Sequence, residues 1–330
     1  MNGRRQDYFA DARLNMKPSS AFTQLGMIAR ECLEPGQRGK VLATFSKAIY
    51  LLTEADELFW ITTGDSPMHR RCAAISTPLP GPLAGSPFRV KDQRLTINSD
   101  TVFDLAHAAT WNEPHAHCIL DVSSLPARIH ALFSHLDFSH TKGFGNFIPL
   151  ILSLSQNNSS DSSSPSDPIL HHAQPLVLDM ALACLNGQPF RITQSADKLI
   201  GLGAGLTPSG DDYLGGMLFA LKTLRDLYPD QFANYAIPME PYRSRTHLIS
   251  FALLNDLAHG HAIAPLHFII NSLLEGKEPE NIQSAVSQLT SIGHSTGWDL
   301  LTGLLVGLKT AHRNNYFITS LQMIPSMERN

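Results

Sequence analysis

The chain has 330 residues, of which 43% are hydrophobic and 16% charged, and its formal net charge is −4. This length suits about two domains, and the hydrophobic fraction is enough for a sizeable core. No concentrated run of Lys and Arg is present, so we expect no nucleic-acid partner. No apolar stretch reaches the ~20 residues of a membrane-spanning helix. Residues 1–8 lack the apolar core of a signal peptide, and the cysteines form no CxxC pair, so we expect a cytoplasmic protein.

Short apolar runs separated by Gly, Pro and Asp clusters fill the N-terminal part of the chain. A short helix is predicted first, over residues 18–33. The apolar runs then follow at 41–45, 48–52, 58–63, 72–76, 88–90 and 95–97. Short strands at this spacing indicate an antiparallel sheet or a small barrel, and a helix is expected after them over residues 126–136.

The C-terminal half has the spacing of amphipathic helices. Leucines and a methionine follow the i, i+3, i+4, i+7 pattern from Leu214 and again from Leu301, and further helices are expected over 248–257, 266–274 and 282–289. Strands followed by helices predict an α+β protein. We expect a mostly antiparallel β domain over 1–152, a Ser-rich linker or loop over 153–168, and a mainly α-helical domain over 169–330.

The first chemical motif is Gly-Leu-Gly-Ala-Gly-Leu-Thr-Pro-Ser-Gly-Asp-Asp over residues 201–212, directly before a predicted helix. Glycines let a backbone approach a ligand closely, and the first N–H groups of a helix attract anions such as phosphate or carboxylate. The spacing fits neither a dinucleotide fingerprint nor a P-loop, because no lysine follows Gly210. The motif therefore predicts an anion pocket of another kind.

The two aspartates of this motif admit two interpretations. Asp212 stands three residues after Ser209, as in a capping box, and Asp211 then favours the helix dipole. In the functional alternative, Asp211 or Asp212 binds a divalent ion or orients a substrate N–H.

The second motif, Gly-His-Ser-Thr-Gly-Trp-Asp over residues 293–299, opens another predicted helix. Thr296 and Asp299 again have capping-box spacing. His294 precedes the helix, where it either satisfies a backbone group or transfers protons. Glycines at four-residue spacing follow on this helix, and Gly215 and Gly216 lie on the first one, which suggests close helix packing with both loops at one pocket. Arg245 is a candidate clamp for a carboxylate.

Together the two motifs resemble the AllH-like family, whose members carry a Leu-Thr-Pro-Ser-Gly-Asp-Asp segment and a later Gly-His-Ser-Ser-Gly-Trp-Asp segment. The resemblance extends upstream to residues 39–45 and so covers most of the chain. Ala204 stands where proline is common, Thr296 replaces serine, and His247 replaces a threonine in the segment 246–250. The last departure bears on the substrate if that segment reaches the pocket.

The resemblance implies a subunit of oxamate carbamoyltransferase, which interconverts oxalurate plus phosphate with oxamate plus carbamoyl phosphate in allantoin and purine breakdown. Its partners would be an AllF/FdrA-like and an AllG-like subunit. On this hypothesis the phosphate-binding residues are Gly203, Gly205, Thr207, Ser209 and Gly210. Asp211 or Asp212 would orient the amide or hold Mg²⁺, His294 would move protons, and Ser295 and Thr296 would donate hydrogen bonds. A non-catalytic anion-binding or assembly subunit and a kinase-like enzyme are the alternatives.

Overall fold

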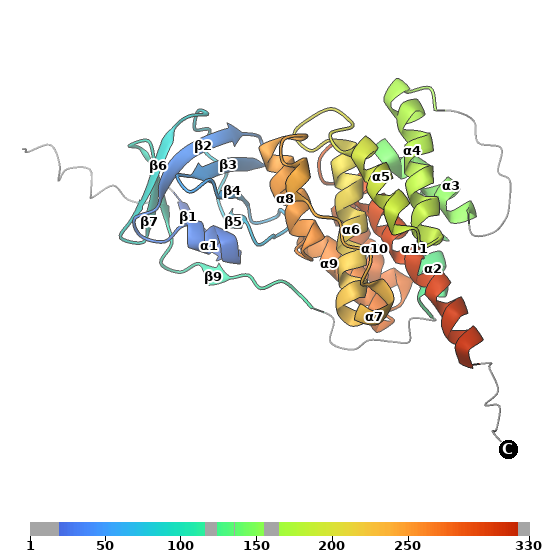
Figure 1. The fold of residues 1–330 in the computed structure, drawn as a ribbon. Coiled ribbons are helices and arrows are strands. Elements are labelled where there is room, and N and C mark those ends of the chain that lie inside the picture. The colour runs from blue at the N-terminus through green and yellow to red at the C-terminus, as the bar shows by residue number, and fades with distance from the viewer. Residues whose placement is uncertain (1–19, 116–123, 135, 155–164, 323–330) are drawn as a thin grey trace, which may run out of the picture. The chain divides into compact units, whose positions relative to one another are not determined.

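The computed structural model describes residues 20–115, 124–134, 136–154 and 165–322 (Figure 1). The chain divides into two compact units, Met1–Glu113 and Pro114–Asn330. The first unit holds all the described strands and the second holds all the long helices. The predicted α+β class is therefore confirmed.

The first unit is built from short strands and one short helix, α1 (Met27–Cys32). The strands are β1 (Ser20–Leu25), β2 (Arg38–Thr44), β3 (Ala48–Thr53), β4 (Leu58–Thr63), β5 (Cys72–Ile75), β6 (Pro87–Lys91), β7 (Arg94–Ile97), β8 (Thr101–Asp104) and β9 (Ala109–Thr110). Eight of them form a ring in the order β5-β4-β3-β2-β6-β7-β8-β1, which the pairing of β1 with β5 closes. The ninth, β9, adds to β1.

The predicted mostly antiparallel β domain is wrong, because the unit is a closed mixed barrel. β4 runs parallel to β5, and β1 runs parallel to both β8 and β9. Turn residues in a sequence indicate hairpins between successive strands, whereas parallel pairs need crossing connections that leave no such mark. The pairing that closes the ring joins the first and fifth strands, and no local pattern in the sequence indicates it.

The helix predicted over residues 18–33 is wrong in its first half, where the chain forms β1. Ser20 and Phe22 are buried while Ala21 and Thr23 are exposed, which is the period-two pattern of a strand. Gly26 then separates the strand from α1, and a Cβ atom there would lie only 2.3 Å from a backbone oxygen of the β4–β5 connection. Only residues 27–32 are helical.

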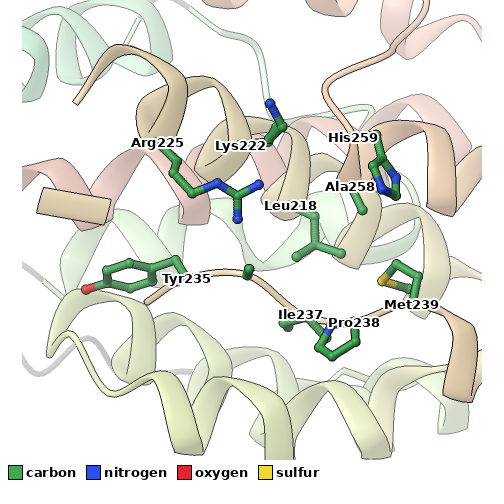
Figure 2. A pocket seen from close by; sticks show the side chains of 10 residues that line it. Leu218, Lys222, Arg225, Tyr235, Ile237, Pro238, Met239, Ala258 and His259 are labelled. Atoms are coloured by element: carbon green, nitrogen blue, oxygen red, sulfur yellow. The ribbon is translucent and has the colours of Figure 1, made fainter. Parts of the chain in front are cut away.

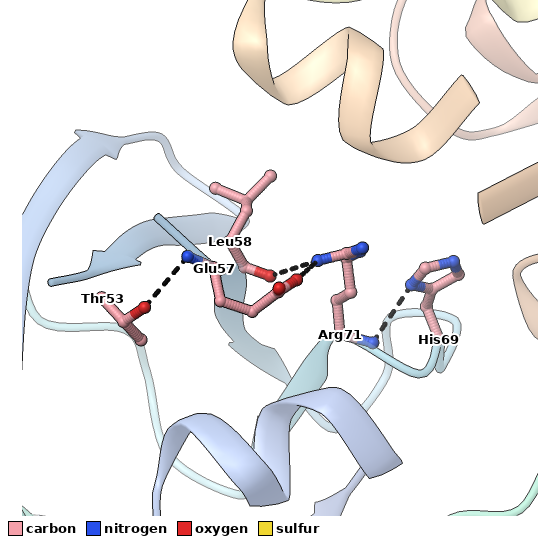
Figure 3. Close-up of polar contacts among 5 residues, drawn as sticks. All are labelled: Thr53, Glu57, Leu58, His69 and Arg71. Atoms are coloured by element: carbon pink, nitrogen blue, oxygen red, sulfur yellow. Dashed lines mark hydrogen bonds and ion pairs between the residues drawn. The ribbon is translucent and has the colours of Figure 1, made fainter. Parts of the chain in front are cut away.

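Polar contacts fix the crossover between the parallel strands β4 and β5 (Figure 3). Arg71, which is 7% exposed, donates from Nη1 to the carbonyl of Leu58 at 3.0 Å and pairs with the carboxylate of Glu57. Its backbone N–H donates to Nδ1 of His69 at 3.2 Å, and that of Glu57 donates to the hydroxyl of Thr53 at 3.0 Å. The carboxylate of Glu57 and the carbonyl of Leu58 thereby offset the cost of burying the charged guanidinium.

All the regular elements among the described residues of the second unit are helices. Its elements are α2 (Leu125–Ser134), η2 (Gly143–Phe147), α3 (Ile148–Ser153), α4 (Pro168–Leu185), α5 (Pro189–Leu199), α6 (Ser209–Leu227), α7 (Pro229–Phe232), η3 (Glu240–Tyr242), α8 (Leu248–Ala258), α9 (Ala264–Glu275), α10 (Pro279–Thr290) and α11 (Thr296–Gln322). The helices predicted near 126–136, 248–257, 266–274 and 282–289 are confirmed. Over the described part of the chain, no helix combines the length and the apolar character that crossing a membrane demands.

The two units divide at residues 113 and 114, whereas the sequence predicts a domain boundary at residue 152. The elements between these positions belong to the helical unit because Leu132, Phe144 and Ile148 are part of its hydrophobic core. The predicted linker over 153–168 lies largely outside the described residues, and Asp167 near its end caps α4.

Glycines allow α6 and α11 to pack in close contact (Figure 1). A Cβ atom on Gly303 would lie 1.8 Å from the carbonyl oxygen of Tyr213, and one on Gly307 would lie 2.6 Å from that of Met217. Both contacts advance by one turn in the same direction, so the helices are parallel. The starts of α6 and α11, which carry the two motifs, therefore lie at the same end of the helical unit.

Candidate functional site

The first motif forms a loop that folds back over the start of α6. Gly201, Gly203 and Gly205 have positive φ values of 75°, 124° and 97°, a region that favours glycine. A Cβ atom on Gly203 would lie 2.7 Å from the backbone nitrogen of Ser209. The close approach of the loop to the helix start therefore depends on the missing side chain.

The interpretation of Ser209 and Asp212 as a capping box is wrong. Pro208 is the N-cap of α6, no side chain caps the helix, and Ser209 is already helical. The N–H of Asp212 donates to the carbonyl of Pro208 at 3.1 Å, and that of Gly210 donates to the carbonyl of Leu202 at 2.8 Å. The amide of Gly210 is thus engaged within the protein.

Asp211 is fully supplied with hydrogen bonds and is 1% exposed. Its Oδ1 atom accepts the backbone N–H of Gly201 at 2.7 Å. Its Oδ2 atom accepts the hydroxyl of Ser250 at 2.6 Å and that of Thr246. This carboxylate ties the glycine loop to α6 and to the start of α8, which is the segment that departs from the family pattern at His247.

Two hydroxyl pairs join the two motifs across the starts of α6 and α11. The Oγ1 atoms of Thr207 and Thr296 lie 3.1 Å apart, and the Oγ atoms of Ser209 and Ser295 lie 3.4 Å apart. These four side chains come from motifs more than eighty positions apart in the sequence. The predicted convergence of the two motifs is confirmed by these contacts.

Asp299 lies beneath these hydroxyls and anchors a third segment to the site. Its Oδ1 atom accepts the backbone N–H of Phe144 at 2.6 Å, and a Cβ atom on Gly143 would lie 2.3 Å from the same oxygen. The spacing with Thr296 suggested that Asp299 caps α11, but its side chain instead binds the backbone of Phe144. The sequence did not indicate this segment, although Gly143 and Gly145 alternate with phenylalanines much as the glycines of the first motif alternate.

Asp212 and Asp299 form a pair of buried carboxyl groups, at 6% and 0% exposure. Burial raises the pKa of Asp212 well above its ordinary value, the charge of Asp299 raises it further, and hydrogen bonds from Thr296 and Thr207 oppose the change. Both causes disfavour the ionised form, so this aspartate favours its protonated state.

Burial also raises the pKa of Asp299 to about 7, although hydrogen bonds from Phe144, Ser209 and Ser295 to the carboxylate lower it. A carboxyl that titrates near neutral pH can give or take a proton under ordinary conditions. The hydroxyls of Ser209 and Ser295 therefore act against the effect of burial on this carboxyl.

One oxygen of each carboxyl is left without a hydrogen bond. The Oδ2 atoms of Asp212 and Asp299 are buried and have no partner among the described residues. A buried acceptor without a donor is costly, by about 1–3 kcal/mol. The cluster of Asp212, Asp299 and the four hydroxyls, which we call the carboxyl cluster, thus has the chemistry to accept an amide N–H, a shared proton or a cation.

The metal prediction for Asp211 and Asp212 places two acids side by side in sequence, but their side chains contact different groups. Asp211 binds Gly201, Thr246 and Ser250, while Asp212 contacts the hydroxyls of the carboxyl cluster. Over the described part of the chain, no group of three or more His, Cys, Asp or Glu side chains could hold a metal ion.

The remaining candidate residues lie at the edge of the site. Gly205 and His294 are exposed on the two motif loops. Arg245 is also exposed, and its guanidinium pairs with Asp197, 3.1 Å away, at the end of α5. Its backbone oxygen would lie 2.7 Å from a Cβ atom on Gly201, so this arginine supports the first loop through its main chain.

Comparisons with known proteins bear on the segment that holds both motifs. The search of solved structures returned no match to the chain. A protein-family model does match, over residues 199–308, and its span runs from the glycine loop into the first half of α11. The family predicted from the two motifs is therefore confirmed for this segment, which matches the model described as oxamate carbamoyltransferase subunit AllH.

Proposed function

We propose that this chain is a subunit of a carbamoyltransferase that acts on oxalurate and oxamate, and that the carboxyl cluster binds the nitrogen side of the substrate. The family match supports the first part, because the name of the family is that of an oxamate carbamoyltransferase subunit. The unpartnered oxygens of Asp212 and Asp299 carry the second part. The amide of oxamate and the ureido group of oxalurate both present N–H donors that would satisfy such oxygens.

The reaction in the direction of carbamoyl phosphate needs a proton donor at nitrogen. A phosphate oxygen attacks the carbamoyl carbon of oxalurate, the bond from that carbon to the internal nitrogen breaks, and oxamate leaves after its nitrogen takes one proton. A protonated carboxyl is a suitable general acid for this step. Asp299, whose burial raises its pKa to about 7, is the group that we assign to it.

The phosphate would lie beside the carboxyls and not against them, since ionised carboxylates repel an anion. We assign its binding to the backbone around Gly203 and Gly205, the hydroxyl of Thr207 and the ring of His294, which is exposed on the second motif loop. Backbone N–H groups and hydroxyls at a helix start are suitable donors for it. Asp211 would act as a positioning residue that holds the loop.

A divalent ion such as Mg²⁺ is the other occupant that the unpartnered oxygens of Asp212 and Asp299 would accept, with hydroxyls and water completing its oxygen ligands. The two occupants predict different behaviour. An enzyme that uses the carboxyls for an amide keeps its activity after dialysis against a chelator, whereas one that uses them for Mg²⁺ loses it and recovers it when the ion is restored.

The test is carbamoyl phosphate formation from oxalurate and phosphate, measured on the purified chain alone and together with AllF/FdrA-like and AllG-like subunits. Asp299→Asn removes the acid at nearly constant shape, and we expect turnover to fall about a hundredfold or more. Asp100→Asn, an exposed change on the barrel unit, is the matched control and should leave turnover unchanged.

Two results would count against this function. Absence of carbamoyl phosphate with every combination of subunits would reject the substrate. Normal turnover of Asp299→Asn and Asp212→Asn, combined with altered assembly of the complex, would instead support a non-catalytic assembly subunit.

A further inference from the structure

A pocket of about 310 Å³ lies toward the C-terminal end of α6, away from both motifs (Figure 2). Its walls come from α6, from the connection between α7 and η3, and from the end of α8. The lining residues are Leu218, Lys222, Arg225, Tyr235, Ala236, Ile237, Pro238, Met239, Ala258 and His259. This volume is at the lower end of the range for small-molecule sites, which is about 300–1,000 Å³.

The charge in this pocket is basic. Lys222, Arg225 and His259 line it, and none of its described lining residues is acidic. Lys222 is neutralised by Asp226 one turn further along α6. For Arg225, no ion pair exists within the described residues, and Figure 2 shows its guanidinium directed into the hollow. A guanidinium in this position is a donor for a carboxylate, which it binds with two parallel hydrogen bonds.

The rest of the pocket's lining is largely apolar. Leu218, on the same face of α6 as Arg225, is buried, as are Ile237 and Met239 from the connection between α7 and η3; Pro238 and Ala258 add to this lining (Figure 2). An inorganic anion would gain nothing from these side chains, whereas a ligand with a flat or branched hydrocarbon part would bury that part out of water against them. The pocket therefore combines one positively charged side chain, Arg225, with an apolar surface that a hydrocarbon group can contact.

From this geometry we propose that the pocket is a second binding site, for a small carboxylate that carries an aromatic or branched apolar group. The carboxylate would pair with Arg225, and the apolar group would contact Leu218, Ile237 and Met239. The Nδ1–H of His259 already donates to the backbone carbonyl of Asn255, 2.7 Å away, and the ring of this histidine lines the pocket.

This site is separate from the carboxyl cluster. Asp212 and Lys222 lie ten positions apart on one continuous helix, a rise of about 15 Å. Oxalurate and oxamate have no hydrocarbon group that would cover the apolar lining. The proposed ligand is therefore neither substrate nor product of the proposed reaction, and its binding can be tested without that reaction.

The experiment is calorimetric titration of the full-length chain with 2-naphthoate, 2-naphthamide and inorganic phosphate. The naphthoate should bind, and the uncharged amide of the same shape should bind at least about tenfold more weakly because it lacks the charge-assisted pair. Phosphate should bind this site still more weakly. Arg225→Gln should weaken naphthoate binding by about tenfold or more, while Arg89→Gln, an exposed change on the barrel unit, should leave it unchanged.

A second variant keeps the test decisive if Arg225→Gln does not fold. Ala258→Leu fills the pocket with hydrocarbon and should abolish naphthoate binding while the thermal unfolding midpoint stays near that of the natural chain. Absence of naphthoate binding to the natural chain would overturn the proposal. Binding that both variants leave intact, or phosphate binding as tight as naphthoate binding, would overturn it as well.

Discussion

Asp211 and Asp212 are neighbours in sequence, but the regions around them are opposite in character. Both oxygens of Asp211 accept hydrogen bonds, from Gly201, Thr246 and Ser250. Asp212 shares a buried space with a second acid, Asp299, and each leaves one oxygen without a partner. A satisfied carboxylate stabilises the fold, whereas an unsatisfied buried pair lowers stability and is retained where a ligand or proton completes it.

The largest effect on stability is expected where the hydrogen bonds are complete. Asp211→Ala would leave the N–H of Gly201 and the hydroxyls of Thr246 and Ser250 without their acceptor. We expect the free energy of unfolding to fall by about 3 kcal/mol. Urea unfolding measures it, with Asp100→Ala as the exposed control, which should change it by less than about 0.5 kcal/mol. A loss below about 1 kcal/mol for Asp211→Ala would refute the structural role.

The parallel packing that brings both regions together depends on Gly303. A methyl group there would lie 1.8 Å from the carbonyl oxygen of Tyr213, so α11 would have to move away from α6. Gly303→Ala should cost about 2 kcal/mol of stability, after the gain in helix propensity is subtracted. Gly81→Ala, where open space surrounds the site, should cost much less. Equal thermal unfolding midpoints for the two variants would contradict the close approach.

Substitution within the carboxyl pair is expected to raise the free energy of unfolding, whereas the two substitutions above lower it. Asp299 ionises at about pH 7 in the folded chain, against an ordinary value of 3.8. Because the folded state binds this proton more tightly, its contribution to stability is complete at low pH, falls as pH rises from about 4 to 7, and is constant above. Asp299→Asn should therefore raise the free energy of unfolding by about 1–2 kcal/mol at pH 8 and change it little near pH 4.

This variant keeps an oxygen that can accept the N–H of Phe144, so the comparison isolates the charge. Unfolding in urea at several pH values is the measurement. Destabilisation by Asp299→Asn at pH 8 would show that the folded chain already stabilises the ionised carboxylate. Asp299 would then resemble Asp211, and the proposed difference between the two regions would be refuted.

The smallest effect is expected at Arg245. Its guanidinium pairs with Asp197 at the surface, where both side chains are about half exposed. Such pairs contribute less than about 1 kcal/mol, so Arg245→Gln should leave stability nearly unchanged. Turnover should also stay within about twofold if this arginine supports the loop only through its backbone oxygen. A large loss of turnover would instead indicate that the Arg245 side chain binds the substrate, as the sequence suggested.

Local patterns predicted the helical half of the fold and most short strands of the barrel, but not how those strands pair. Leucine spacing marks α6 and α11 because each helix buries one face against neighbours. The strand β1 carries its signal in only a few alternating residues, beside the helix α1, and the closing pair between β1 and β5 leaves no local trace. Closure is decided by contacts between distant segments.

The sequence predicted that the two motifs would meet, but not which hydrogen bonds their side chains make. Glycines within the two predicted helices indicated that both motifs would meet, because small residues permit close helix packing. Which aspartate is satisfied and which is not depends on partners from Gly143, Phe144, Thr246 and Ser250, which lie in other segments. Spacing within one motif cannot supply that information.

The most direct measurement is a structure of the chain, assembled with its partner subunits, in the presence of oxamate and phosphate. We predict that the amide nitrogen of oxamate lies within hydrogen-bond distance of Asp212 or Asp299, with phosphate beside the glycine loop. Oxamate bound elsewhere, or a carboxyl pair still without a partner while the complex turns over, would contradict the account.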